Sequence, residues 1–168
     1  MTVAGHSRLG KTALVAGAYD ERFALAYSND SGCAGAAICR EKLGERVARI
    51  NNVFGFWFAE KFAEHGEREE QMPFDQHWLV GLMAPRHVYV ASAEEDEWAD
   101  PASEYLSCQA ASCFYETLGE TGFVGPDTPP KAESYFHDGK IGYHLRHGTH
   151  YFSRRDWYFL MEYMKKHL

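Results

Sequence analysis

The sequence Gly5-His6-Ser7-Arg8-Leu9-Gly10-Lys11 stands directly behind a short apolar run and ahead of an alanine-rich stretch. This order predicts a strand, a tight turn at Ser7 and a helix. Gly5 and Gly10 supply the small residues that a sharp turn needs, and the helix points its N-terminus toward negative charge developing near the serine. The spacing is G-x-S-x-x-G rather than the commoner G-x-S-x-G. The motif predicts a nucleophilic Ser7, and the alternative is a glycine-bounded turn with an inert serine.

Ser7 lies almost at the start of the chain. In an α/β-hydrolase the nucleophile follows a central strand, so several strands precede it. We therefore expect residues 1–168 to form a single partial catalytic domain, the C-terminal part of an α/β-hydrolase with a mostly parallel sheet, helices on both faces and the N-terminal strands missing. The absence of a signal peptide is then uninformative. We also expect the chain alone to be poorly soluble or oligomeric, because its first strand would lack a neighbour.

Composition narrows the class of protein. The chain has 168 residues, of which 45% are hydrophobic and 15% aromatic, enough for one globular domain with a core. Its formal net charge of -7 argues against a nucleic-acid partner. No apolar run approaches the ~20 residues that span a bilayer, so we expect no membrane segment. The four cysteines lack paired C-x-x-C metal spacing and allow three disulfide pairings or none: Cys33, Cys39, Cys108 and Cys113.

Helical and strand patterns alternate along the rest of the chain. The expected strands cover residues 25–28, 87–93 and 133–137, the last of these being the final strand. The expected helices cover residues 11–19, 57–63, 76–82 behind an Asp75 cap, 101–118 and 155–168. This alternation, without internal repeats, is typical of an α/β sheet.

A serine nucleophile needs a base and an acid, and the hydrolase order is serine, acid, histidine. His150 lies in the loop between the last expected strand and the last helix, where Nε2 can reach the serine while Nδ1 donates to a carboxylate. His144 and His147 are close alternatives, and a solvated loop histidine without a catalytic role is the simplest interpretation of any one of them.

Two carboxylates compete for the acid's role. Asp96 follows the strand 87–93, which is the usual position of the acid, whereas Asp30 follows the strand 25–28. Without a catalytic role, Asp96 is one surface acid in a run of four, and Asp30 is a turn-forming residue in Asn-Asp-Ser-Gly.

Several spaced motifs carry a family resemblance: Gly5 to Ala13, Ser28 to Ala37, Pro73 to His77, Ala84 to Arg86, Ala91 to Pro101, Gly148 to His150 and Asp156-Trp157. Together they resemble, nearly end to end, the bacterial glucuronoyl esterases of carbohydrate esterase family 15. The resemblance implies a three-layer α/β-hydrolase that cleaves esters between glucuronic acid on xylan and lignin alcohols, without a metal or other cofactor. It also implies an exported, periplasmic or extracellular enzyme.

Carried over by position, the resemblance makes Ser7 the nucleophile and His150 the base. In this family the acid comes from the place held here by Asp30 or from the place held by Asp96. An aspartate stands at the first place, where a glutamate is common, and its shorter reach leads us to favour Asp96. Arg8 resembles the arginine that stabilises the oxyanion with its backbone N–H and its guanidinium.

Three further positions resemble residues that contact the sugar: Lys11 one helical turn beyond Ser7, Glu45 and Trp98. Their alternatives without a binding role are a solvated helix residue, a helix-start charge and a core aromatic, respectively. Two other functions stay open from the sequence. One is an acetyl xylan or other serine esterase on the same scaffold, and the other is an inactive fragment.

Overall fold

Five strands form one sheet in the order β1-β2-β3-β5-β4, and the computed structural model describes all 168 residues. The strands are β1 (Thr2–His6), β2 (Leu25–Asn29), β3 (His87–Ala93), β4 (Ser134–Phe136) and β5 (Ile141–Arg146). The first three and β5 run parallel, and β4 pairs antiparallel with β5. The mostly parallel sheet that we expected is confirmed. The carboxyl ends of β1, β2, β3 and β5 therefore meet at one edge of the sheet.

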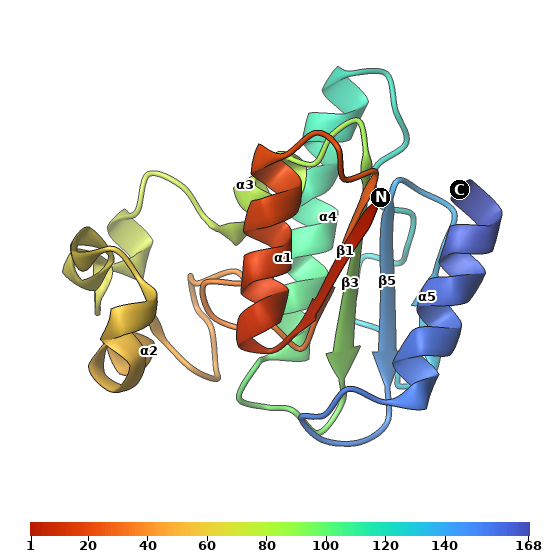
Figure 1. Cartoon of the computed structure of the whole chain (residues 1–168). Coiled ribbons are helices and arrows are strands. Elements are labelled where there is room, and N and C mark those ends of the chain that lie inside the picture. Colours follow the sequence, from red (N-terminus) through yellow and green to blue (C-terminus); the bar gives the residue numbers. More distant parts are fainter.

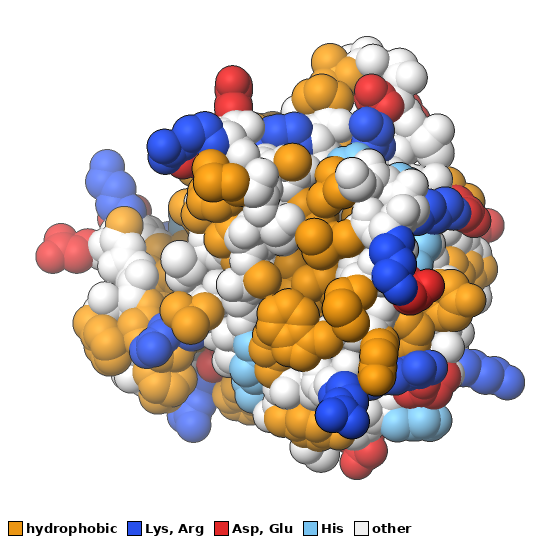
Figure 2. Space-filling view, turned by 45° about the vertical axis from the view of Figure 1, so that its right-hand side comes forward, with side chains coloured by type: hydrophobic (Ala, Val, Ile, Leu, Met, Phe, Trp, Pro, Cys, Tyr) orange, Lys and Arg blue, Asp and Glu red, His pale blue; other side chains and the backbone are white.

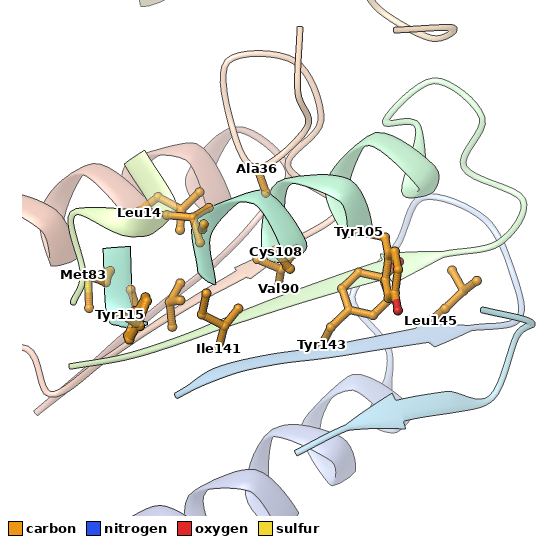
Figure 3. Packing of buried hydrophobic residues seen from close by; sticks show 14 residues of the cluster. Leu14, Ala36, Met83, Val90, Tyr105, Cys108, Tyr115, Ile141, Tyr143 and Leu145 are labelled. Atoms are coloured by element: carbon orange, nitrogen blue, oxygen red, sulfur yellow. The ribbon is translucent and has the colours of Figure 1, made fainter. Parts of the chain in front are cut away.

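Helices cover both faces of this sheet (Figure 1). They are α1 (Arg8–Tyr19), α3 (Gln76–Gly81) and α4 (Pro101–Thr117) on one face and α5 (Arg154–His167) on the other. The larger core lies under α1 and α4 and includes Leu14, Val90, Cys108 and Ile141, as Figure 3 shows. A second core under α5 includes Tyr27, Tyr89 and Phe159. Because both faces are covered, β2, β3 and β5 are buried along their whole length.

The helix expected over residues 57–63 is wrong. The segment holds an α-helix earlier in the chain, α2 (Val47–Phe54), followed by three short 3₁₀ turns, Gly55–Trp57, Glu60–His65 and Glu69–Gln71. Phe54 stacks on Trp57 with their ring centroids 4.1 Å apart. This three-residue spacing suits the tighter 3₁₀ turn, in which residues three apart are eclipsed. The segment stands beside the α/β core in Figure 1 and has its own small apolar cluster.

The expectation that 133–137 is the final strand is also wrong. That segment forms the short edge strand β4, and β5 comes after it between β3 and β4. All six residues of β5 are buried. The strand nevertheless lacks the continuous apolar pattern of a buried strand, because it contains Gly142, His144 and Arg146. Gly142 is required there, because a Cβ at this position would lie 2.4 Å from the Tyr89 ring.

The remaining expected elements match the observed ones to within three residues at either end. None of the helices combines the length and the apolar character needed to cross a membrane. All four cysteines are free thiols, and only Cys113 is exposed.

Candidate active site

Ser7 occupies a strained turn between β1 and α1. Its φ of 56° lies in the left-handed region, which costs free energy for a residue with a side chain. Ser7 N–H donates to the Asn29 carbonyl at 2.8 Å. Gly5 is required, because a Cβ there would lie 2.0 Å from the Leu9 carbonyl oxygen, and at Gly10 a Cβ would lie 3.0 Å from Ser31 Cβ. The glycines of the motif thus let β1 and α1 approach closely enough to present Ser7.

A hydrogen-bonded line of side chains leads to Ser7. His150 Nε2 lies 2.8 Å from Ser7 Oγ, and His150 Nδ1 lies 2.6 Å from Asp96 Oδ2. The three residues follow β1, β3 and β5, whose carboxyl ends share one sheet edge. Asp96 is buried and the His150 side chain is 44% exposed. The hydrogen bond that His150 donates to Asp96 raises the pKa of His150, against the opposing effect of burial.

Asp30 lies near the same residues but bonds differently. Its Oδ2 accepts from Arg146 Nη2 at 3.1 Å, and its buried Oδ1 has no hydrogen-bond partner. Burial raises the pKa of Asp30 to about 9, the nearby Glu104 carboxylate acts in the same direction, and Arg146 opposes it. Arg146 also pairs with Asp156, so one buried guanidinium faces two carboxyl groups. Its charge is balanced when Asp156 is ionised and Asp30 is neutral.

The two alternative histidines lie away from Ser7. His144 is fully buried, with Nδ1 3.0 Å from Tyr89 Oη and Nε2 2.9 Å from Asp156 Oδ1. His147 is exposed and pairs with Glu94 at 2.9 Å. Of the three candidates that the sequence left open, the structure brings His150 to the serine.

Asp30, Asp96 and His150 offer one potential metal-ligand atom each, and these atoms lie within 4.8 Å of one another. Both ring nitrogens of His150 are already engaged, one by Asp96 and one by Ser7. A metal at this place would have to displace one of those partners.

A cleft of about 320 Å³ opens beside this line. Its lining includes Ser7, Asp96 and His150, the three sequence-predicted sugar contacts Lys11, Glu45 and Trp98, and also Asp30, Phe54 and Trp57. The structure thus brings together seven of the eight predicted site residues here, and Arg8 lines an adjoining groove behind Trp57.

The structure excludes the alternative roles given for Lys11 and Trp98, whereas Glu45 does stand at the start of a helix, two residues before α2. Lys11 is half-buried and its Nζ donates to the Cys33 carbonyl at 2.7 Å and to the Ser31 carbonyl, and burial lowers its pKa. Glu45 is nearly buried, and burial raises its pKa. Trp98 is 54% exposed, so it is not a core aromatic.

Trp57, which the sequence predicted only as part of a helix, is a further residue of this candidate site. It lines the cleft, and its ring lies 5.1 Å from the Arg8 guanidinium carbon, a cation–π distance. The dense aromatic run from Phe54 to Phe62 was the available signal. His6 was also missed: its ring lies 4.7 Å from that of His150, and its Nδ1 lies 2.6 Å from Asn29 Oδ1.

Known proteins similar to this chain belong to one family. Residues 1–119 match the family model described as glucuronyl esterase, fungi. Carbohydrate esterase MZ0003, from an unknown prokaryotic organism, is 46% identical over the whole chain, which covers 38% of that protein.

Two solved structures extend the comparison. A promiscuous CE15 esterase from a marine bacterial metagenome superposes with a TM-score of 0.96 at 47% identity, over 99% of this chain and 42% of that one. A glucuronoyl esterase mutant from Sporotrichum thermophile, solved with methyl 4-O-methyl-β-D-glucopyranuronate, gives a TM-score of 0.76 at 26% identity, over 98% and 42%. The chain thus spans about two fifths of the length of these relatives. On its sequence and its α/β-hydrolase fold, it belongs to the glucuronoyl esterases of carbohydrate esterase family 15.

Proposed function

We propose that this chain carries the catalytic centre of a serine carboxylesterase that hydrolyses glucuronoyl esters, the bonds joining glucuronic acid on xylan to lignin alcohols. The observation that carries the proposal is the line from Asp96 through His150 to Ser7, with separations of 2.6 and 2.8 Å. The complex of the Sporotrichum thermophile relative with a methyl uronate supports a uronic acid as the acyl group.

The reaction proceeds in two half-reactions through an acyl-enzyme. His150 Nε2 takes the proton of Ser7 Oγ as that oxygen attacks the ester carbonyl carbon. When the tetrahedral intermediate collapses, the bond to the alcohol oxygen breaks and His150 gives the proton to that oxygen. Water, deprotonated by His150, then attacks the uronoyl–Ser7 ester, and glucuronate leaves as Ser7 regains its proton.

Asp96 determines the tautomer of His150 and stabilises its protonated form during both half-reactions. By accepting the Nδ1–H bond, it keeps Nε2 free to take the proton of Ser7. The negative charge of Asp96 stabilises the imidazolium that forms in the transition state. Asp30 makes no hydrogen bond to His150, so we assign it no part in this proton transfer.

We assign the stabilisation of the oxyanion to Arg8, which follows Ser7 at the first position of α1. The first N–H groups of a helix lack partners within the helix, and the helix dipole favours negative charge there. The Arg8 guanidinium, held over the Trp57 ring, adds a positive charge beside the cleft. Loss of one oxyanion donor typically costs ~10²-fold or more in turnover.

The cleft is suited to an acyl group that is itself a sugar acid. Lys11 offers a donor, Glu45 an acceptor, and Trp98 an exposed aromatic face against which a sugar ring can pack. These groups lie beside Ser7 and therefore recognise the acyl side of the scissile bond.

A second candidate, an esterase of broader specificity, is favoured by the description of the marine relative as promiscuous. Initial rates on benzyl glucuronate, acetylated xylan and p-nitrophenyl acetate separate the two. We expect benzyl glucuronate to give the highest kcat/KM. We also expect Glu45→Gln to lower that value about 10-fold, as for loss of a charged hydrogen bond, with little change on p-nitrophenyl acetate. A higher kcat/KM on acetylated xylan or on p-nitrophenyl acetate than on benzyl glucuronate, with the same preference in Glu45→Gln, would support the broader esterase.

A further inference from the structure

Arg146 is a buried cation at the carboxyl end of β5, directly before the loop that carries His150. Its side chain is 1% exposed. Nε donates to both carboxylate oxygens of Asp156, at 3.0 and 2.8 Å, and Nη2 donates to Asp30 Oδ2 at 3.1 Å. A hydrogen bond from His144 and one from Ser153 lower the pKa of Asp156 to about 2, although burial acts in the opposite direction. Asp156 is therefore the anionic partner of the buried guanidinium.

The same guanidinium bonds to the backbone around His150. Nη1 donates to the His147 carbonyl at 3.0 Å, and Nη2 donates to the Thr149 carbonyl at 3.2 Å and to the Tyr151 carbonyl. The guanidinium carbon also lies 4.3 Å from the centre of the Tyr151 ring. These carbonyls belong to the residues on both sides of His150. Arginine alone offers five donors in one rigid plane, so it can hold several carbonyls and two carboxyl groups together.

The loop that carries His150 is exposed. His147, Thr149, His150 and Tyr151 are exposed, and Gly148 has a φ of 104°. Outside the guanidinium, its backbone makes three hydrogen bonds: Glu95 N–H donates to the Gly148 carbonyl at 3.0 Å, Tyr151 N–H to the Thr149 carbonyl at 2.9 Å, and His147 N–H to Glu133 Oε1 at 3.3 Å. Just beyond the loop, Phe152 packs on the core under α5. His150 thus sits on an exposed stretch of chain whose backbone carbonyls are held mainly by the Arg146 guanidinium.

We infer that Arg146 is a positioning residue for catalysis: by binding the carbonyls of His147, Thr149 and Tyr151, it holds the His150 imidazole between Asp96 and Ser7. The inference rests on the proposed function, because it assigns His150 the role of base. The positioning is indirect, since Arg146 does not itself line the cleft and reaches it only through its hydrogen bond to Asp30.

The test compares Arg146→Lys with the parent protein. Lysine keeps the buried positive charge but, with a single nitrogen, cannot bond all three carbonyls and both carboxyl groups. We expect kcat on benzyl glucuronate to fall about 10- to 100-fold with KM nearly unchanged, because a small misplacement of a catalytic group has costs of that order. The matched control is Arg155→Lys, at an exposed arginine near the same loop that pairs with Glu133, and we expect it to leave kcat unchanged.

Two readouts distinguish positioning from general damage. The acidic limb of the kcat/KM profile reports the titration of His150, which is faced by Asp96, His6, Asp30, Glu104 and Lys11. When the contact with Asp96 loosens, this limb moves to lower pH. The proton resonance of His150 Nδ1–H, shifted downfield by its short bond to Asp96, weakens or moves upfield in Arg146→Lys and stays in place in Arg155→Lys.

Tyr151→Leu provides a milder variant if Arg146→Lys does not fold, since it removes only the ring packed on the guanidinium. We expect kcat, the acidic limb and the His150 resonance to change in the same directions as in Arg146→Lys, but by less. A folded Arg146→Lys with parental kcat, pH limb and resonance would overturn the inference, as would a loss of kcat that only matches the loss of folded protein. If the parent hydrolyses no uronate ester, the proposed function fails, and the resonance alone decides the role of Arg146.

Discussion

Asp96 and Asp30 follow adjacent parallel strands, yet only Asp96 contacts His150. We expect Asp96→Asn to lower kcat/KM on a glucuronoyl ester by up to about 10⁴-fold, the cost of a misoriented histidine tautomer in a serine protease triad. Asp30→Asn should cost much less, because an amide closely resembles the neutral carboxyl that Arg146 already holds. Steady-state kinetics of both variants checks this. A reversed order would make Asp30 the catalytic acid, and equal, modest losses would mean that the two share the role.

The pH dependence of catalysis follows from His150. Its pKa is raised, chiefly by the hydrogen bond to Asp96, and the neutral imidazole is the active base. The rate therefore rises with pH as His150 loses its proton. In Asp96→Asn the stabilising charge is gone, so the pKa of His150 falls and the acidic limb of kcat/KM moves to lower pH while the plateau drops. A profile recorded from acid to neutral pH checks the shift, and an unmoved limb would show that Asp96 does not set the pKa of His150.

Single residues of the site were predictable to different degrees. Ser7 could be predicted because a tight turn between a strand and a helix needs small neighbouring residues. His150 and Asp96 could be predicted because a base and an acid follow particular strands in this fold. Asp96 was favoured over Asp30 only on the reach of the side chain. The hydrogen bond that holds Asp30 could not be predicted, because its donor, Arg146, lies 116 residues away in the sequence. The role of Trp57 could not be predicted, because a run of aromatic residues is compatible with both a core helix and the wall of a cleft.

At the level of elements, α5 covers a network of buried histidines. His137 Nε2 lies 2.7 Å from Tyr89 Oη, which also contacts His144. Burial lowers the pKa of His137 to about 4, below the ordinary value of 6.5 that it regains on unfolding. The unfolded chain therefore binds this proton more tightly, so the contribution of His137 to stability is complete above pH 6.5 and is lost as the pH falls toward 4.

Replacing His137 by glutamine should reduce this loss. We expect the drop in melting temperature between pH 7 and pH 4.5 to be smaller in His137→Gln than in the parent, whatever other groups contribute to the slope. His147→Gln is the matched control at an exposed histidine and should follow the parent curve. Calorimetric melts at a series of pH values make the comparison, and parallel curves for all three proteins would exclude His137 as a source of acid sensitivity.

The predictable elements were those with an apolar pattern or a clear cap. Asp75 caps α3 through Gln76 N–H, and Pro101 opens α4, as their sequence signals indicated. By contrast, β5 carries a buried arginine and a buried histidine whose partners, Asp156 and Tyr89, lie on other elements. Such burial is decided by tertiary hydrogen bonds, which a local pattern does not contain.

At the scale of the whole molecule, the sheet has an open edge at β1, which pairs with β2 alone. Exposed apolar side chains lie beside this edge, among them Met1, just before β1, and Leu9 on α1, which packs on β1. Figure 2 shows hydrophobic side chains gathered across one face of the molecule. Open edges and apolar patches drive association. We expect residues 1–168 expressed alone to self-associate and to hydrolyse esters slowly, and light scattering checks this. A monodisperse monomer with full activity would contradict it.

Ser7 is the residue that we propose forms the covalent bond to the uronoyl group. The direct measurement is turnover of benzyl glucuronate by the intact protein and by Ser7→Ala, with glucuronate binding measured on both. Because the nucleophile makes the acyl-enzyme but few of the contacts that hold the sugar acid, we predict that hydrolysis is abolished in Ser7→Ala while binding is largely retained. Substantial turnover by a folded Ser7→Ala protein would contradict the covalent mechanism, and with it the assignment of this turn as the catalytic centre.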